Sequence, residues 1–93
     1  MSILSNIIDG IYALVGGKMS LEELGDELDK KAAAAPEKLD WRHSVVDLMK
    51  LTNQDSSLAA RETLARELGY HGPYNGSAEM NIWLHHEIMQ RLR

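Results

Sequence analysis

Residues 39–89 read LDWRHSVVDLMKLTNQDSSLAARETLARELGYHGPYNGSAEMNIWLHHEIM, and this stretch decides the fold. Three segments within it carry apolar residues at helical spacing, and residues that typically end or start helices separate them. The stretch contains no nucleophile elbow, no phosphate-binding glycine loop and no cysteine. It therefore says much about architecture and little about chemistry.

The three segments are predicted to be helices from the N-cap at residue 40 to about 52, over about 57–68, and from after residue 77 to about 92. Asp40 is the expected N-cap of the first, Gly69 ends the second, and Ser77 precedes the third. The third has the widest apolar face and is expected to lie at the centre, with Trp41 and Trp83 as buried anchors between it and the first. The inward residues are expected to be Val45, Leu48, Met49 and Leu51, then Leu58, Leu64, Ala65 and Leu68, then Met80, Ile82, Leu84, Ile88, Met89 and Leu92.

Two further helices are predicted upstream, over residues 2–15 and from Ser20 to the residues before Pro36. Gly16 and Gly17 end the first, and Ser20 with Glu23 forms a capping box at the start of the second. One half of the first helix is apolar: Ile3, Leu4, Ile7, Ile8, Ile11, Tyr12, Leu14 and Val15. The second has a narrower apolar stripe: Leu21, Leu24, Leu28, Ala32 and Ala35.

The fold class that follows is all-α. Long runs of Val, Ile and Thr at a period of two residues, which would favour a sheet, are missing from this 93-residue chain. We expect a compact bundle of four helices in residues 18–93. Residues 1–17 are expected to form a separate amphipathic N-terminal helix with a Gly-Gly hinge.

Charge and cysteine content exclude several classes of protein. The net charge is −4, and residues 20–40 account for all of it, with seven acidic residues against three lysines. A basic stripe for a phosphate backbone is missing, so nucleic-acid binding is not expected. Without cysteine there is no disulfide or thiolate metal site, and no apolar segment is long enough to span a bilayer. The expected location is the cytoplasm.

Metal binding and catalysis are not predicted, and no cofactor is expected. The four histidines are His43, His71, His85 and His86, and the last two are adjacent, so their side chains point about 100° apart on a helix and do not readily share a metal ion. No motif arranges a nucleophile, a base and an oxyanion donor, so the chain is not expected to be an enzyme.

Three polar residues fall within expected apolar faces, namely Arg61, Asn81 and His85. Leaving such a group unsatisfied costs about 1–3 kcal/mol, so each must find a partner. The favoured interpretation is a hydrogen-bonded network that fixes helix register or caps a neighbouring helix. The alternative is a polar pocket for a small ligand.

The N-terminal helix has three possible uses. Its apolar face can pack on its own domain or on a second copy, bind another protein, or lie on a membrane surface. The polar half lacks Lys and Arg, which disfavours binding to anionic lipid. The residues most expected to contact a protein partner or a second copy are Ile7, Ile8, Ile11 and Leu14.

Several blocks of the chain resemble a known family. LDWRHSVVDLMKL, DSSLAARETLARELGY and SAEMNIWLH are similar to a small bacterial family of helical domains, domain-of-unknown-function family 3597, and MSILSNIIDGIYAL resembles its N-terminal helix. The resemblance covers nearly the whole chain. It implies a compact helical domain behind a short N-terminal helix and implies nothing about activity. Members often carry a long Ala/Pro-rich linker after the first helix, which is here reduced to residues 16–20 or 32–35.

Two functions remain open. The first is an interaction or adaptor module that works through the N-terminal helix or the 70–76 loop, with a protein partner still to be identified or with a second copy. The second is a small-molecule-binding domain with a pocket around Arg61, Asn81 and His85.

Overall fold

A computed structural model describes residues 3–17, 19–75 and 77–92 of the chain. These residues form five α-helices and no strand: α1 (Ile3–Val15), α2 (Leu21–Ala34), α3 (Val45–Leu51), α4 (Leu58–Leu68) and α5 (Ala78–Arg91). The all-α prediction is confirmed. The expected helix start at residue 2 lies outside the described residues. No helix in the described part is long and apolar enough to cross a membrane.

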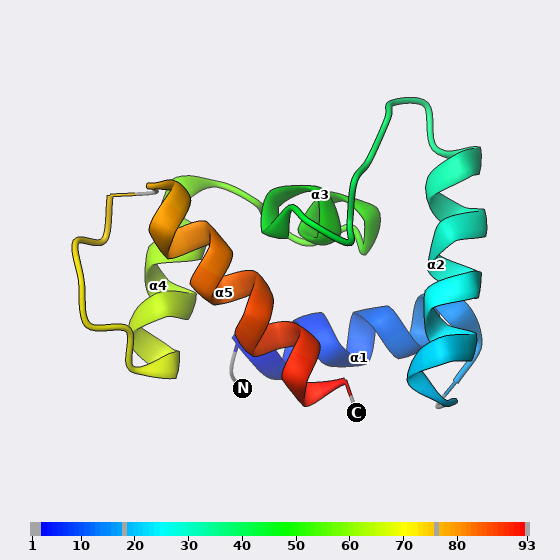
Figure 1. The fold of residues 1–93 in the computed structure, drawn as a ribbon, viewed down its shortest axis with the longest axis horizontal. Helices are drawn as coiled ribbons and strands as arrows, with labels where there is room; N and C mark the ends of the chain where they lie inside the picture. The colour runs from blue at the N-terminus through cyan, green and yellow to red at the C-terminus, as the bar shows by residue number, and fades with distance from the viewer. Residues whose placement is uncertain (1–2, 18, 76, 93) are drawn as a thin grey trace.

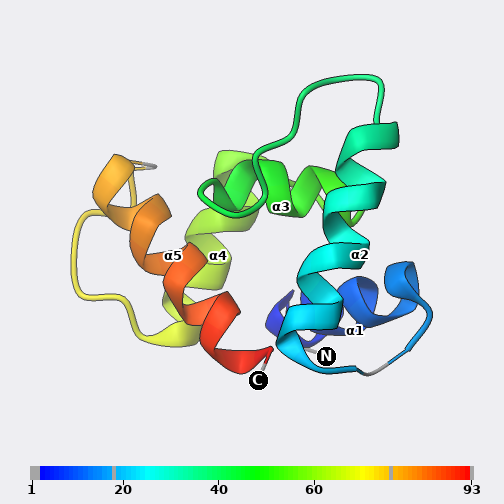
Figure 2. The same ribbon diagram turned by 45° about the vertical axis from the view of Figure 1, so that its right-hand side comes forward.

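The helices are arranged around α1 and α5. In Figure 1, α5 crosses in front of α1 and α4, while α2 stands at the far end of α1. Figure 2 shows α3 above α1, with the long loop from α2 arching over it. Helix α5 packs against α1, α3 and α4, which agrees with its expected central place, and α1 packs against α2, α4 and α5.

Serine caps start four of the helices. In each, the serine Oγ accepts a hydrogen bond from the backbone N–H three residues on, and these serines are Ser20, Ser44, Ser57 and Ser77. The predicted Asp40 N-cap is wrong. Residues 41–43 form a turn that closes on the Asp40 carbonyl, and the extended backbone of Ser44 separates it from α3. The Asp47 carboxylate then accepts from the Asp40 N–H at 2.8 Å.

The helix ends follow glycine and proline as expected. Gly69 has a φ of 83° and caps α4, with its N–H directed at the carbonyls of Ala65 and Arg66. Gly16 and Gly17 also have positive φ, at 93° and 131°, and terminate α1. Ala35, before Pro36, has extended backbone, so α2 ends at Ala34.

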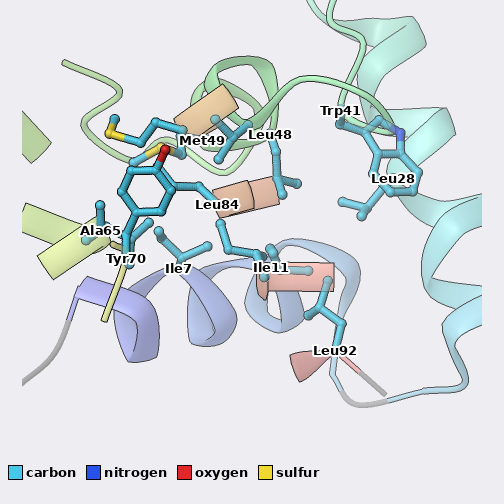
Figure 3. Packing of buried hydrophobic residues seen from close by; sticks show 14 of the residues in the cluster. Ile7, Ile11, Leu28, Trp41, Leu48, Met49, Ala65, Tyr70, Leu84 and Leu92 are labelled. Atoms are coloured by element: carbon cyan, nitrogen blue, oxygen red, sulfur yellow. The ribbon is translucent and has the colours of Figure 1, made fainter. Parts of the chain in front are cut away.

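One apolar core joins all five helices. Figure 3 shows Ile7 and Ile11 directed from α1 toward Leu84 of α5. The fully buried side chains are Ile7, Ile11, Leu24, Leu28, Val45, Leu48, Met49, Leu64, Met80, Leu84, Ile88 and Leu92. Most of the expected inward positions are therefore confirmed.

Three expected core positions are exposed, and others, Trp83 among them, are only half-buried. Ile82 is 67% exposed, Leu58 42% and Leu21 38%. The buried stripe of α5 follows Met80, Leu84 and Ile88, and 100° per residue turns Ile82 to the opposite side. Trp41 is only 3% exposed, but Trp83 is half-buried and packs its ring against Tyr70, at 5.1 Å between ring centroids.

Helix α1 is docked on its own domain along several sides. The Glu67 carboxylate of α4 accepts from the N–H groups of Ile3 and Leu4 at 3.1 and 3.0 Å, where a helix start favours negative charge. A Cβ on Gly10 would lie 2.9 Å from Gln54 Nε2, so the turn after α3 closes over the polar half as well. That residues 1–17 form a unit separate from residues 18–93 stays a prediction. In the structure, α1 contributes side chains to the common core.

Candidate functional site

The structure places the predicted interaction residues of α1 inside the domain. Ile7 and Ile11 are fully buried, and Ile8 and Leu14 are half-buried against the same core. Helices α2, α4 and α5 cover this face. In the docked arrangement, α1 offers no open apolar stripe to a partner.

Arg61 and Asn81 are brought together, but His85 is not part of their cluster. Arg61 Nη1 donates to Asn81 Oδ1 at 2.8 Å, and its Nε donates to the carbonyl of Ser56 at 3.2 Å, so the guanidinium joins α5 to the segment before α4. His85 Nε2 donates instead to the carbonyl of Trp41 at 2.7 Å. These hydrogen bonds link helices, as the favoured interpretation expected. The alternative was a ligand pocket around the three residues, and neither of the two surface clefts described below is lined by Arg61 or Asn81.

His43, His85 and His86 have separate partners. His43 Nδ1 lies 3.1 Å from an Asp40 carboxylate oxygen, and the Gln90 side-chain nitrogen lies 2.9 Å from His86 Nε2. Within residues 3–17, 19–75 and 77–92, no three His, Asp or Glu side chains gather as a metal site.

A junction that sequence reasoning missed joins α2 to the 41–43 turn. The Asp29 carboxylate accepts from Trp41 Nε1 at 3.0 Å and from Arg42 Nε and Nη2 at 3.2 and 2.7 Å. The Arg42 guanidinium also lies over the Trp41 ring, 4.5 Å from its centroid. Hydrogen bonding to Arg42 is the main cause that lowers the pKa of Asp29, the bond from Trp41 adds to it, and desolvation opposes both. The sequence shows Asp29 only as one member of an acidic run.

Gly25 makes room for this junction. It lies within α2, where glycine costs about 1 kcal/mol relative to alanine. A Cβ at Gly25 would lie 3.2 Å from Arg42 Nη2, which is closer than most side-chain contacts. The guanidinium can therefore lie across α2 and reach Asp29 because residue 25 has no side chain.

The outer side of α5 carries the most exposed large apolar residue of the described chain. Ile82, His85, His86 and Met89 follow the spacing i, i+3, i+4 and i+7, so they form one stripe along the helix. Arg42 and His43 from the turn before α3 face this stripe, and together the six residues line an open cleft of about 350 Å³. We call this cleft the α5 groove.

The six residues that line the α5 groove are apolar, imidazole or guanidinium side chains. Its two ends are apolar, through Ile82 and Met89, and imidazoles lie between them. Its one permanent charge, on Arg42, is already paired with Asp29. None of the six lining residues is a serine, a cysteine or a carboxylate.

A second cleft, of about 360 Å³, lies where the C-terminal ends of α1, α2 and α3 meet. Leu14, Leu39 and Leu51 contribute apolar surface, and Lys31 and Lys50 stand in the last turns of α2 and α3. Lysines at these positions compensate the negative ends of the helix dipoles. Lys50 also pairs with Glu37 at 3.4 Å. A structural role therefore accounts for both lysines.

Comparison with known proteins identifies the family and gives no activity. A solution structure of a conserved unknown protein from Rhodopseudomonas palustris is similar, with 37% sequence identity and a TM-score of 0.72, over 98% of this chain and 89% of that one. Among curated proteins, none matches this chain. The family profile described as "Domain of unknown function (DUF3597)" matches residues 13–93. Because this match covers most of the chain, the chain belongs to this family.

Proposed function

We propose that this domain is a non-enzymatic protein-interaction module and that the α5 groove binds a helix of its partner. The observation that carries the proposal is the exposure of Ile82, 67%, within a stripe at helical spacing. Single exposed apolar residues are common on protein surfaces. An apolar residue at each end of one stripe, beside a groove, is the pattern by which helices recognise each other.

We propose the same kind of function that the sequence led us to expect, a protein interaction, but we assign it to a surface of α5 and not to α1. The apolar face of α1 is already covered by its own domain, through Ile7 and Ile11. The stripe on α5 borders the buried side of that helix: Ile82 and His86 are exposed, whereas His85 and Met89 are half-buried and Met89 also contacts the core. The same helix can therefore hold the fold and contact a partner. The cytoplasmic location stays a prediction.

The walls of the α5 groove are held in place before any partner arrives. His85 is bonded to the Trp41 carbonyl at 2.7 Å, which fixes α5 against the 41–43 turn. Arg42 is held by Asp29 and by the Trp41 ring. A surface fixed in advance loses little conformational entropy on binding, which favours affinity.

The chemistry of the groove indicates the kind of partner. Because Arg42 and His43 already face Asp29 and Asp40, the groove has little charge to offer. The partner that fits is a helix with apolar side chains at matching spacing and few charges on that face.

The test is affinity capture from the native host with wild type and matched variants. Ile82→Glu places a charge in the groove and should lower the retention of a groove-binding partner at least tenfold. Leu58→Glu makes the same change at an exposed position of α4 and should leave retention unchanged. A partner that the Ile82→Glu protein retains as well as wild type does would place the interaction elsewhere.

A further inference from the structure

The α5 groove has a symmetry that points to one occupant. The stripe reads Ile82, His85, His86, Met89, so an apolar residue stands at each end and a histidine pair in the middle. The positions are evenly placed about the midpoint between residues 85 and 86. Read from its other end, the stripe presents the same order of residue types.

We propose that the α5 groove binds α5 of a second copy of this chain, antiparallel, around a two-fold axis at the midpoint of the stripe. This inference rests on the proposed function and names the partner helix. A two-fold interface needs a self-complementary patch, and this stripe is one. Ile82 of each copy faces Met89 of the other, and the histidines lie beside the axis.

The antiparallel arrangement also suits the charges. Two antiparallel helices place the positive dipole end of one beside the negative end of the other. The only permanent charge among the six groove residues, Arg42, is paired with Asp29 at 2.7 Å in its own chain. Two such grooves can therefore face each other without strong repulsion, although each chain carries a net charge of −4.

The exposed sides of α2 and α4 do not offer such a face. The exposed side of α2 carries charged residues, among them Glu22, Glu23, Asp26 and Lys30. The exposed side of α4 includes Thr63, Arg66 and Glu67. Compared with the exposed sides of α2 and α4, the stripe on α5 is the better match to a sparsely charged helix. A second copy supplies it.

The contact is small, because one helix and a short turn from each copy form it. Interfaces of this size belong to the weak class, and we expect a Kd on the order of 10⁻⁴ M. Sedimentation equilibrium from about 20 µM to 1 mM spans the transition between monomer and dimer at that affinity.

Charge reversal across the axis tests both the surface and the antiparallel direction. Ile82→Lys and Met89→Glu should each abolish the dimer, because each buries unpaired charge. The double variant Ile82→Lys/Met89→Glu should restore it, since each new ammonium group faces a new carboxylate on the other copy. Leu58→Lys, a matched change on α4, should leave the dimer intact. Circular dichroism of each variant checks that the helices are folded.

A second measurement does not depend on variants. In a sample that mixes two isotope labels, intermolecular NOEs should connect the methyl groups of Ile82 to the Met89 methyl of the other copy. A wild-type chain that is monomeric at 1 mM would overturn the proposal, as would a dimer that both single variants leave unchanged or NOEs that join Ile82 to Ile82. In those cases, a captured partner that Ile82→Glu releases would still support the proposed function. A dimer that behaves as expected would support both proposals, because the second copy is then the partner; the absence of a dimer, together with capture unaffected by Ile82→Glu, would remove both.

Discussion

Trp41 donates its indole N–H to the Asp29 carboxylate at 3.0 Å, and this bond ties α2 to the turn that precedes α3. The carbonyl of Trp41 accepts from His85 on α5 at 2.7 Å. One residue therefore links the outermost helix to a central helix. Since α2 packs mainly on α1, this link is its second attachment to the domain.

The first prediction concerns the pH dependence of that link. The pKa of Asp29 is lowered chiefly by its hydrogen bonds with Arg42, so its folded value lies below the ordinary 3.8. The stabilisation is complete above the unfolded value and is lost as the pH falls through the folded value. The melting temperature of wild type should therefore fall more steeply below pH 3.8 than that of Asp29→Asn, as followed by circular dichroism. Asp26→Asn, which removes a nearby charge without a direct bond to Arg42, should retain the wild-type slope.

A second prediction tests why α2 contains a glycine. Gly25→Ala should gain about 1 kcal/mol of helix propensity when Arg42 is absent. When Arg42 is present, the new methyl lies 3.2 Å from Nη2 and displaces the guanidinium, so the gain should shrink or change sign. Urea unfolding of Gly25→Ala in the wild-type and Arg42→Ala backgrounds measures this coupling. Equal effects in both backgrounds would mean that Arg42 does not require the glycine.

The third prediction is that Glu67 caps α1 from another helix. Its carboxylate accepts from two backbone N–H groups at the start of α1. Glu67→Ala should destabilise the domain by about 1 kcal/mol, and Glu67→Gln by less, because the amide retains an acceptor without the charge. Hydrogen exchange at Ile3 and Leu4 should accelerate in the same order. Unchanged exchange in Glu67→Ala would show that the first turn does not need this cap.

The sequence predicted local features better than contacts between distant residues. The capping box at Ser20, the helix start after Ser77 and the stop at Gly69 depend on neighbouring residues, and all are confirmed. The Asp40 cap failed because Ser44, followed three residues later by Asp47, offers a competing start that the pattern left undecided.

Burial was harder to predict where tertiary neighbours decide it. A helical wheel assigns any apolar residue near the stripe to the core, yet Ile82 is 67% exposed, because the described part of the chain covers its side of α5 only partly. The α5 groove and the Asp29 junction each join segments that lie far apart in the chain, as His85 and Trp41 do. The spacing of hydrophobic residues along the chain carries no information about contacts between distant segments. Neither the α5 groove nor the Asp29 junction was therefore predicted.

The last prediction concerns α1. The sequence led us to expect a separate N-terminal helix, whereas in the structure α1 contributes fully buried residues to the core. Ile11→Ala removes a fully buried side chain, which typically costs about 2–5 kcal/mol because a cavity is left. Ile82→Ala makes the same chemical change at a position that is 67% exposed. It should alter the free energy of unfolding by at most about 0.5 kcal/mol. Deleting residues 1–17 should abolish the cooperative thermal transition, because α2 then loses the helix on which it mainly packs. If Ile11→Ala and Ile82→Ala melted together, or if the truncated chain still unfolded cooperatively, α1 would be a detachable element and its apolar face would again be available to a partner.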